Sequence, residues 1–468
     1  MSAASGDGAA PAGAGATAST ADYGRTASFL AIGVGLTGVI TYVYFFIASH
    51  VLSTHDYGQI TVLWSAIFIT ISTLYRPIEQ LLSRHIAEHQ VKGEPIGGTM
   101  RNASLIQLGL SLTFAVLALA LRGPIQDSVL EGNETLYWVF FSTVLFYAAS
   151  YFARGFLAGN KRFGLFTALI LSESCFRTVF AVLVAVSVLS GQSAVAVGIV
   201  AAPALSLIVV PFAFARRART ATSRPPAGKG SKKSAVSMAH GTGFAAAVLL
   251  IMFSEQAFLN AGPLVVRGLR GAEAAGFIFN VLMIARAPLQ LFQAVSTSIL
   301  PHLTGLHTSE EPGSEDEFHR SVRMVLLGLA AFTVLALLFM AVAGPTAMQL
   351  AFSKKFSYDR EGLLLITLGM GLYLSSVTVN QACIAQGQVR RAAARWILCA
   401  GLFIGWNFVP LVENEFRRVE FGFLAAAAAL LSLLYYAYRR PREHVEDIPA
   451  VGSPEELEVR LAAIDDNT

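Results

Sequence analysis

The feature that most constrains this chain is a series of long apolar segments that recurs along nearly its whole length. Each segment has about 20 residues and few charges, which is the length that a helix needs to cross a bilayer. Charged residues make up only 14% of the 468-residue chain, against about 25% in ordinary soluble domains. We therefore predict an all-α, polytopic membrane protein with about 12 transmembrane helices. The segments are residues 27–48, 58–82, 103–121, 136–158, 164–189, 193–215, 241–266, 274–300, 322–343, 361–386, 394–412 and 421–438.

A basic stretch rich in Pro, Gly and Ser, residues 216–240, divides these segments into two groups of six. An even number of spans returns the chain to its starting side, so the two halves share one orientation and are related by a pseudo-two-fold axis along the membrane normal. RPIEQLL (76–82) in the second segment is echoed by RAPLQLF (286–292) in the eighth. The predicted organisation is a disordered cytoplasmic tail (1–24), an N-terminal six-helix bundle (25–216), a basic cytoplasmic linker (217–240), a C-terminal six-helix bundle (241–438) and a cytoplasmic tail (439–468).

The distribution of Lys and Arg predicts the orientation. If the N-terminus is cytoplasmic, the cytoplasmic segments hold 22 basic residues and the external segments hold 8. Basic residues accumulate in cytoplasmic loops. We therefore expect a multi-pass protein of the plasma (cytoplasmic) membrane with both termini in the cytoplasm.

Two of the apolar segments carry a stripe of polar side chains at three- and four-residue steps, which places each stripe on one helix face. In the second segment the stripe is Ser72, Thr73, Arg76, Gln80 and Ser83, and in the eighth it is Arg286, Gln290, Gln293 and Thr297. An arginine in the middle of a bilayer costs about 3 kcal/mol. The stripes are therefore expected to face the protein interior or a water-filled cavity.

The charged residues inside the spans have structural interpretations as well as functional ones. Arg76 and Glu79 are three residues apart and can neutralise each other on one helix. Arg76 can also extend its charge toward the cytoplasmic surface. Glu173 and Arg177 have the spacing of an i,i+4 pair. Arg286 has no acidic residue near it on its own helix, which favours a functional role.

Three further polar residues lie within apolar segments. Glu255 stands alone and is expected either to pair with Arg286 across neighbouring helices or to take up a proton or sodium ion. Asn380 and Gln381 lie in the tenth segment. Hydrogen bonding between helices explains them at least as well as contact with a cargo.

The sequence argues against several classes of function. It has no P-loop, no HExxH and no cluster of metal ligands, so we expect no cofactor, no metal and no enzymatic activity. The modest net charge of +4 indicates basic loops rather than nucleic-acid binding. The GxGxxG match GVGLTG (33–38) lies inside the first apolar segment, where close packing of helices is the better interpretation.

Three stretches resemble the polysaccharide-transporter, or Wzx-type oligosaccharide flippase, family of the multidrug/oligosaccharidyl-lipid/polysaccharide exporter superfamily. The first is FFIASHVLSTHDYGQITVLWSAIFI (45–69), with its YG entry into the second span. The second is FARGFLAGNKRFGLFTALILSESCFRTVFA (152–181), with its RGxLxGxxRF turn. The third is APLQLFQAVSTSILPHLT (287–304), with its LP ending. The resemblance covers residues 25–438.

The resemblance implies two helical bundles around a central cavity that opens alternately to the two sides of the membrane. The cargo that it implies is a polyprenyl-(pyro)phosphate-linked oligosaccharide, which is moved from the inner to the outer leaflet for cell-surface polysaccharide synthesis. Arginines on the second and eighth spans would bind the phosphates, which suits the planar guanidinium group. The expected cavity residues are Arg76, Glu79, Gln80, Glu173, Arg177, Arg286, Gln290, Gln293, Asn380 and Gln381, with Glu255 as the candidate for ion coupling.

Two other functions fit the same residues. One is a cation-coupled exporter of multidrug type, driven by H+ or Na+ and responding through Glu255. The other is a membrane scaffold that transports nothing and organises polysaccharide-synthesis proteins. The partners that we expect in the leading case are the lipid-linked oligosaccharide, the bilayer and polysaccharide-synthesis proteins, with no nucleic acid.

Overall fold

The computed structural model describes residues 14–92, 95–211, 237–286 and 314–440, which form helices and turns with no strand among them. The N-terminal half consists of α1 (Ala14–Val51), α2 (Thr54–Leu74), α3 (Arg76–Lys92), α4 (Gly97–Ala120), the π-helical turn η1 (Pro124–Val129), α5 (Glu134–Gly159), α6 (Phe163–Ala185), α7 (Gly191–Ser206) and the 3-10 turn η2 (Leu207–Val209). The C-terminal half consists of α9 (Ser237–Arg270), a helical segment at 272–286, α11 (Ser314–Phe352), α12 (Arg360–Ala385), α13 (Val389–Trp406) and α14 (Glu415–Arg439).

The helices confirm the prediction of an all-α, polytopic membrane protein. Within the described residues, ten helical stretches are long and apolar enough to cross a membrane, with α2 and α3 counted as one. The helical segment 272–286 and the 18-residue helix α13 occupy the places of the other two predicted spans. Helix α13 carries three arginines, Arg390, Arg391 and Arg395, in its first half.

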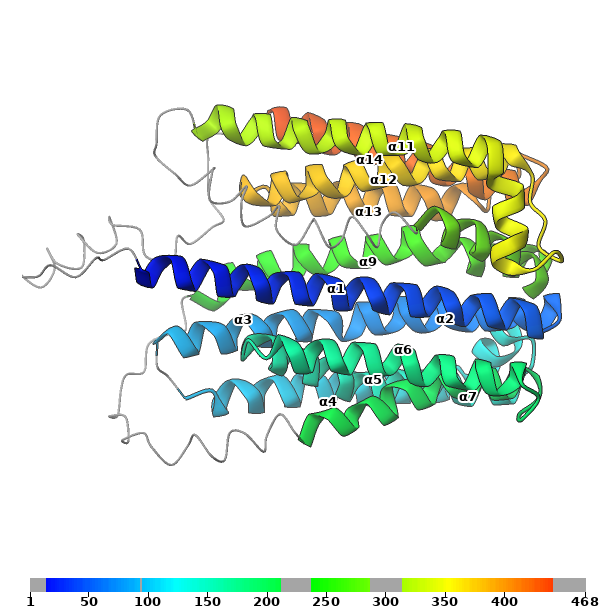
Figure 1. Ribbon diagram of the computed structural model, residues 1–468, viewed down its shortest axis with the longest axis horizontal. Helices are drawn as coiled ribbons and strands as arrows, with labels where there is room; N and C mark the ends of the chain where they lie inside the picture. Colours follow the sequence, from blue (N-terminus) through cyan, green and yellow to red (C-terminus); the bar gives the residue numbers. More distant parts are fainter. Residues whose placement is uncertain (1–13, 93–94, 212–236, 287–313, 441–468) are drawn as a thin grey trace, which may run out of the picture.

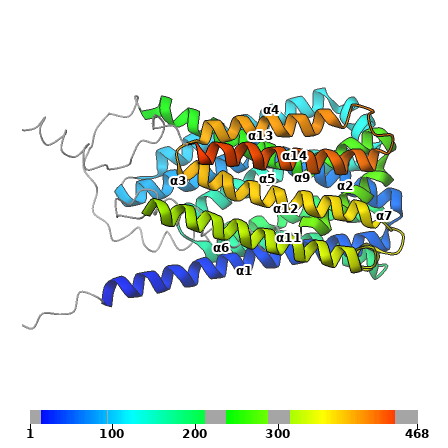
Figure 2. The same cartoon turned by 90° about the horizontal axis from the view of Figure 1, so that it is seen from above.

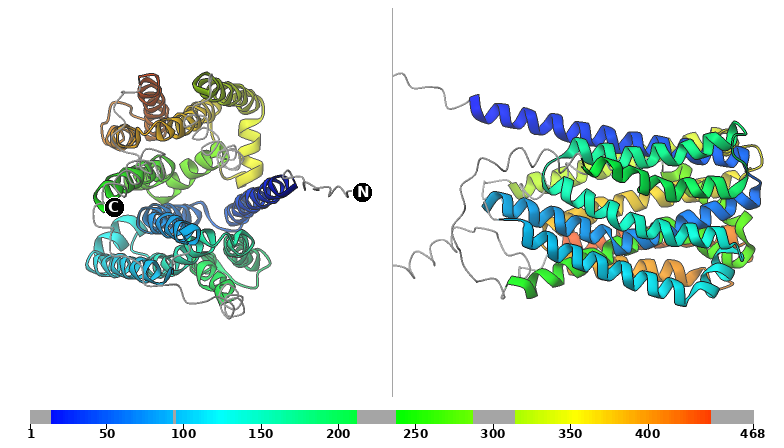
Figure 3. Two further views of the ribbon diagram at one scale, coloured as in Figure 1. Left: turned by 90° about the vertical axis from the view of Figure 1, so that its left-hand side faces the viewer. Right: turned by 90° about the horizontal axis from the view of Figure 1, so that it is seen from below.

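The two halves lie side by side with their helices roughly parallel to one long axis (Figure 1). An end-on view separates the N-terminal half from the C-terminal half, and α2 and α9 pack against each other between them (Figure 3). Helix α1 begins and α14 ends at the same end of the bundle (Figure 2). We call the opposite end, where the loops before α2, α5, α12 and α14 lie, the far end.

The outermost helices show the pattern of a surface that faces lipid. Only 17% of the apolar window of α4 and 11% of that of α11 is buried inside the protein. The exposed side chains of α4 include Leu105, Leu108 and Leu112, and those of α11 include Leu335 and Val342. Apolar side chains on the outside are unfavourable in water and ordinary in a bilayer, so this surface agrees with the membrane assignment.

The second span is broken at Tyr75, one residue before Arg76. Helix α2 ends at Leu74 and α3 begins at Arg76, with Pro77 in its first turn. Proline has no N–H to donate to the preceding turn, whereas it is tolerated at the start of a helix. The sequence therefore ends one helix and starts the next where Arg76 turns toward the centre of the molecule.

A close helix contact at Gly33 confirms the interpretation of the GVGLTG segment. A Cβ atom on Gly33 would lie 2.1 Å from Cγ2 of Thr167 on α6. The glycine is thus required by the approach of α1 to α6, and no dinucleotide-binding turn is formed.

A bend in α11 brings the C-terminal half across the far end. The helix contains Pro345, and its last part turns away from the bundle axis toward α1 (Figure 1). Beyond the helix, Lys355 Nζ donates to the Leu52 carbonyl over 3.3 Å, and the rings of Phe356 and Tyr57 are 4.9 Å apart. The two halves are therefore fastened together at this end.

Three boundaries differ from the sequence prediction. Helix α1 begins at Ala14, within residues 1–24 that we assigned to the tail. Helix α9 begins at Ser237, before the predicted end of the linker. Helix α11 begins at Ser314, before the apolar segment that predicted it.

Candidate functional site

Charged and phenolic side chains from both halves gather near the middle of the molecule. This central cluster consists of Tyr42 on α1, Arg76 at the start of α3, Glu255 on α9, Arg286 at the end of the helical segment 272–286, and Tyr373 on α12. Glu255 interacts electrostatically with Arg76, and Tyr373 interacts with Glu255, Arg76 and Arg286. Two arginines from opposite halves therefore lie around one tyrosine.

Arg286 is the least compensated charge of the central cluster. Its Nε and Nη2 atoms are buried and have no hydrogen-bond partner in the described part of the chain. Its electrostatic neighbours are the phenols of Tyr42 and Tyr373 rather than a carboxylate. The Tyr42 hydroxyl donates a hydrogen bond to the Met283 carbonyl over 2.5 Å. A buried cation without a counter-charge is unfavourable, so this position suits an anion.

Arg76 and Glu255 face each other from opposite halves without direct contact. Among the described residues Arg76 forms no ion pair within 4 Å, and both side chains are partly exposed. Arg76 also interacts electrostatically with Glu79, which lies close to Arg154. Arg76 therefore interacts electrostatically both with its helical neighbour Glu79 and with Glu255 of the other half.

A second polar cluster lies inside the N-terminal half, around Glu173 on α6. Its carboxylate accepts hydrogen bonds from Ser150 (2.5 Å) and Ser206 (3.4 Å) and forms an ion pair with Arg154 on α5. Arg154 also lies over the Tyr151 ring, with Cζ 4.6 Å from the ring centre. Sequence analysis missed Arg154, because it was counted among the basic residues of the cytoplasmic loop.

The expected pair of Glu173 with Arg177 is not formed. Arg177 instead lies over the Trp64 ring at 4.4 Å, and its Nη2 donates to Ser174 over 3.3 Å and to Thr41 over 3.5 Å. Arg154 provides a closer cation for Glu173 from a neighbouring helix. The aromatic ring supplies Arg177 with a negative face in place of a carboxylate.

Replacing Glu173 by alanine is expected to destabilise the fold. The change leaves the Arg154 guanidinium, whose side chain is 14% exposed, without its partner. Breaking a buried ion pair on one side costs about 3–5 kcal/mol. Thermal unfolding in detergent should show a clearly lower melting temperature for Glu173→Ala and no change for the exposed Gln80→Ala. Equal melting temperatures would show that the ion pair does not stabilise the fold.

The remaining predicted site residues fall into three groups. Gln80 is exposed, outside the central cluster. Asn380 is buried and accepts a hydrogen bond from Trp396 over 3.0 Å, so it joins α12 to α13, while the Gln381 Oε1 atom is buried without a partner among the described residues. Gln290 and Gln293 lie outside the described residues.

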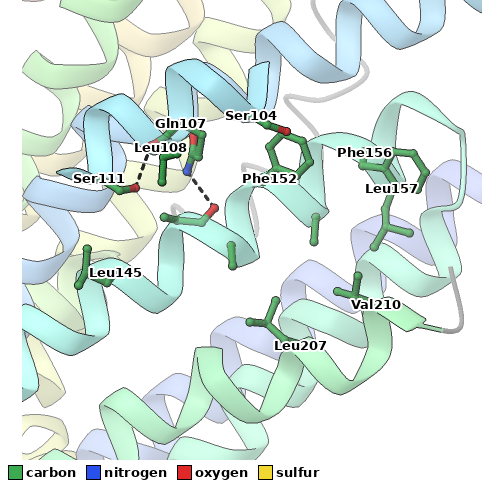
Figure 4. A pocket seen from close by; sticks show the side chains of 13 residues that line it. Ser104, Gln107, Leu108, Ser111, Leu145, Phe152, Phe156, Leu157, Leu207 and Val210 are labelled. Atoms are coloured by element: carbon green, nitrogen blue, oxygen red, sulfur yellow. Dashed lines mark hydrogen bonds between the residues drawn. The ribbon is translucent and has the colours of Figure 1, made fainter. Parts of the chain in front are cut away.

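Each half also carries an apolar groove on its outer surface. The N-terminal groove has a volume of 460 Å³ and lies between α4, α5 and residues 207–210 (Figure 4). The C-terminal groove, of 520 Å³, lies between α11, α12 and α14. These are the third, fourth and sixth spans of each half, so the grooves follow the pseudo-two-fold relation. Neither is lined by a charged residue, so both are separate from the central cluster.

Within the described residues, the molecule is a membrane protein of two helical bundles that meet around a cluster of two arginines, one glutamate and two tyrosines. No family model matches the sequence, and no curated protein matches it. Among solved structures, the chain is similar to an inward-facing multidrug resistance MATE family transporter of the MOP superfamily. The TM-score is 0.63 at 11% identity, over 88% of this chain and 97% of that one.

Two further structures have the same fold. An outward-facing MATE family transporter matches with a TM-score of 0.57 at 13% identity, over 88% of this chain and 94% of that one. A eukaryotic MATE transporter matches with a TM-score of 0.61 at 13% identity, over 89% and 96%. The chain therefore has the two-bundle fold of these transporters.

Proposed function

We propose that the protein is an alternating-access transporter of the plasma membrane. Its two-bundle fold is that of solved transporters. Its two halves, which have the same orientation in the membrane, meet around a polar centre. The excess of basic residues in alternate loops supports cytoplasmic termini, which makes the far end the outer end. With this orientation, the contacts at the far end would close the outer side, which supports an inward-facing arrangement.

The cargo that the geometry supports best is an anionic lipid-linked saccharide, of the polyprenyl-(pyro)phosphate class. The observation that carries this proposal is the Arg286 guanidinium, whose buried Nε and Nη2 atoms have no partner among the described residues and whose electrostatic neighbours there are two phenols. In and around the central cluster and the second polar cluster, arginines outnumber glutamates. The four arginines are Arg76, Arg154, Arg177 and Arg286, and the three glutamates are Glu79, Glu173 and Glu255. A phosphate brought to Arg286 would satisfy its free N–H groups, and guanidinium is well shaped for that contact. The lipid tail would remain in apolar surroundings.

A second candidate is a cation-coupled exporter of small amphipathic molecules. It is favoured by Glu255, a partly exposed carboxylate at the interface of the halves that interacts with Arg76 across it. Such a group can exchange a proton or a sodium ion as the halves move, since opposite charges favour its ionised form and separation removes that effect. The solved structures with this fold include multidrug resistance transporters.

Transport in proteoliposomes tests the two candidates. A fluorescent polyprenyl-pyrophosphate-linked disaccharide in the inner leaflet is expected to reach the outer leaflet faster with protein than without it. An uncharged polyprenol carrying the same disaccharide serves as the control and is expected to gain no acceleration. Equal rates for both lipids would overturn the anionic-cargo proposal. Movement of a cationic dye under a proton or sodium gradient, without lipid movement, would support the exporter.

A further inference from the structure

A single carboxylate bridges the two halves at the far end. Glu131 lies in the loop between η1 and α5, and its Oε2 accepts hydrogen bonds from His55 (2.8 Å) and Gln59 (2.9 Å) on α2. Its Oε1 accepts from the backbone N–H of Ala272, at 3.1 Å. Arg267 Nη2 lies 3.8 Å from the same oxygen. The carboxylate thus has partners in the N-terminal half and in the C-terminal half.

The contact to Ala272 is a helix cap made by the other half. Ala272 is the first residue of the helical segment 272–286, and Gly271 before it has a φ of 86°. The first N–H groups of a helix have no partner within it, and a negative charge is favourable there. Glu131 therefore supplies an N-terminal cap across the interface, which the C-terminal half loses if the halves part.

The backbone at Glu131 is held in an uncommon conformation. Its φ is 54°, in the left-handed region that favours glycine, and Gly132 follows with a φ of 77°. Non-glycine residues persist in such regions where the surroundings determine them, and they cluster at switching elements. The neighbouring Arg267 also donates to the carbonyls of Ser128 and Asp127, so the whole turn is tied to the end of α9.

We propose that Glu131 is the latch that holds the outer ends of the two halves together in the inward-facing state. The proposal rests on the alternating-access function proposed above. Opening to the outside would break the bonds to Ala272 and Arg267, while those to His55 and Gln59 remain within the N-terminal half. The latch would favour the inward-facing state until cargo binding overcomes it.

The latch remains charged at neutral pH. Burial acts to raise the pKa of Glu131, but hydrogen bonds from Gln59 and Ala272 and the presence of His55 outweigh it, so the pKa lies below its usual range. The latch is therefore intact at neutral pH and is lost only as pH falls through that lowered value. Further charged groups on the elements around it are Asp56 on α2, Asp127 on η1, the Arg122–Glu134 pair, Arg270, which pairs with Glu415, and Glu273.

A spin-label distance across the outer end tests the latch. Labels at Val188 and Leu411, which are 67% and 72% exposed, report on the two halves after the three cysteines are replaced by serine. In liposomes without cargo at neutral pH, Glu131→Gln is expected to raise the ratio of long to short distances roughly tenfold. Glu131→Asn, which tolerates the left-handed backbone but is too short to bridge, should do the same.

Glu134→Gln is the matched control, because Glu134 lies three residues away and pairs with Arg122 within its own half. It should leave the distances unchanged, as should both Glu131 variants if the latch does not exist. Suppose that cargo changes the distances in the wild type and that both Glu131 variants give the same distances as the wild type. That outcome would overturn the latch but not alternating access. Distances that stay short in every variant and with every cargo would contradict alternating access itself. Melting temperatures identify a misfolded variant. If one of the two Glu131 variants is misfolded, the distances of the other one test the latch.

Discussion

Arg286→Met is expected to make the protein more stable and to reduce transport of an anionic cargo strongly. The substitution removes a cation whose Nε and Nη2 atoms are buried without partners among the described residues, and it leaves a shorter, unbranched apolar side chain. Replacing an uncompensated buried charge by an apolar group is stabilising by about 1–4 kcal/mol in the cases measured for ion pairs. A contact from guanidinium to phosphate contributes about 1.5–3 kcal/mol, so cargo binding should weaken by roughly 10- to 150-fold.

Thermal unfolding and the liposome assay measure the two effects separately. Arg154→Met is the matched control, since Arg154 is paired with Glu173 and its loss should lower the melting temperature. Arg286→Lys keeps the charge but not the planar fork, so it should retain part of the transport. If Arg286→Met lowers stability as Arg154→Met does, then Arg286 has a structural partner and is no site for cargo.

Gly58→Val is expected to prevent the outer ends of the halves from meeting. A Cβ atom on Gly58 would lie 2.0 Å from the Ala272 carbonyl oxygen and 2.9 Å from the Glu273 nitrogen, and backbone atoms cannot turn aside as a side chain can. Gly276 faces the same place, where its own Cβ would lie 3.2 Å from the Gly58 Cα. Overpacking costs about 1–3 kcal/mol in a tight interior, enough to reverse a balance between two conformations.

The spin-label pair described for Glu131 should show predominantly long distances in Gly58→Val, and transport should fall to the background rate. Gly35→Ala on α1, where a Cβ would have no atom within 4 Å, should behave as the wild type. Short distances in Gly58→Val would mean that α2 and the segment from Ala272 adjust without separating, and would remove the contact from the closing mechanism.

The fold was predictable because each span can be recognised from its own stretch of sequence. Twenty apolar residues are recognised without knowing what they pack against, and Pro77 marks the break at Tyr75 by its missing N–H. The expectation that Arg76 and Arg286 face the interior came from the cost of exposing them to lipid.

The partners of charged residues were less predictable, because they depend on how separate helices are rotated against one another. Spacing along α6 suggested Arg177 for Glu173, whereas α5 provides Arg154. Glu131 gave no signal at all, because a glutamate in a loop is ordinary. Only the approach of residue 272 from the other half turns it into a bridge.

The bend of α11 carries part of the C-terminal half over to the N-terminal half. The stretch that follows Pro345 leaves the bundle, reaches α1, and ends where Lys355 and Phe356 meet Leu52 and Tyr57. Because this stretch contacts the N-terminal half, a rotation of one bundle against the other would displace the residues that it contacts. If the halves move as proposed, this contact would act on the junction between α1 and α2 at Leu52 and Tyr57, at the far end rather than at the central cluster.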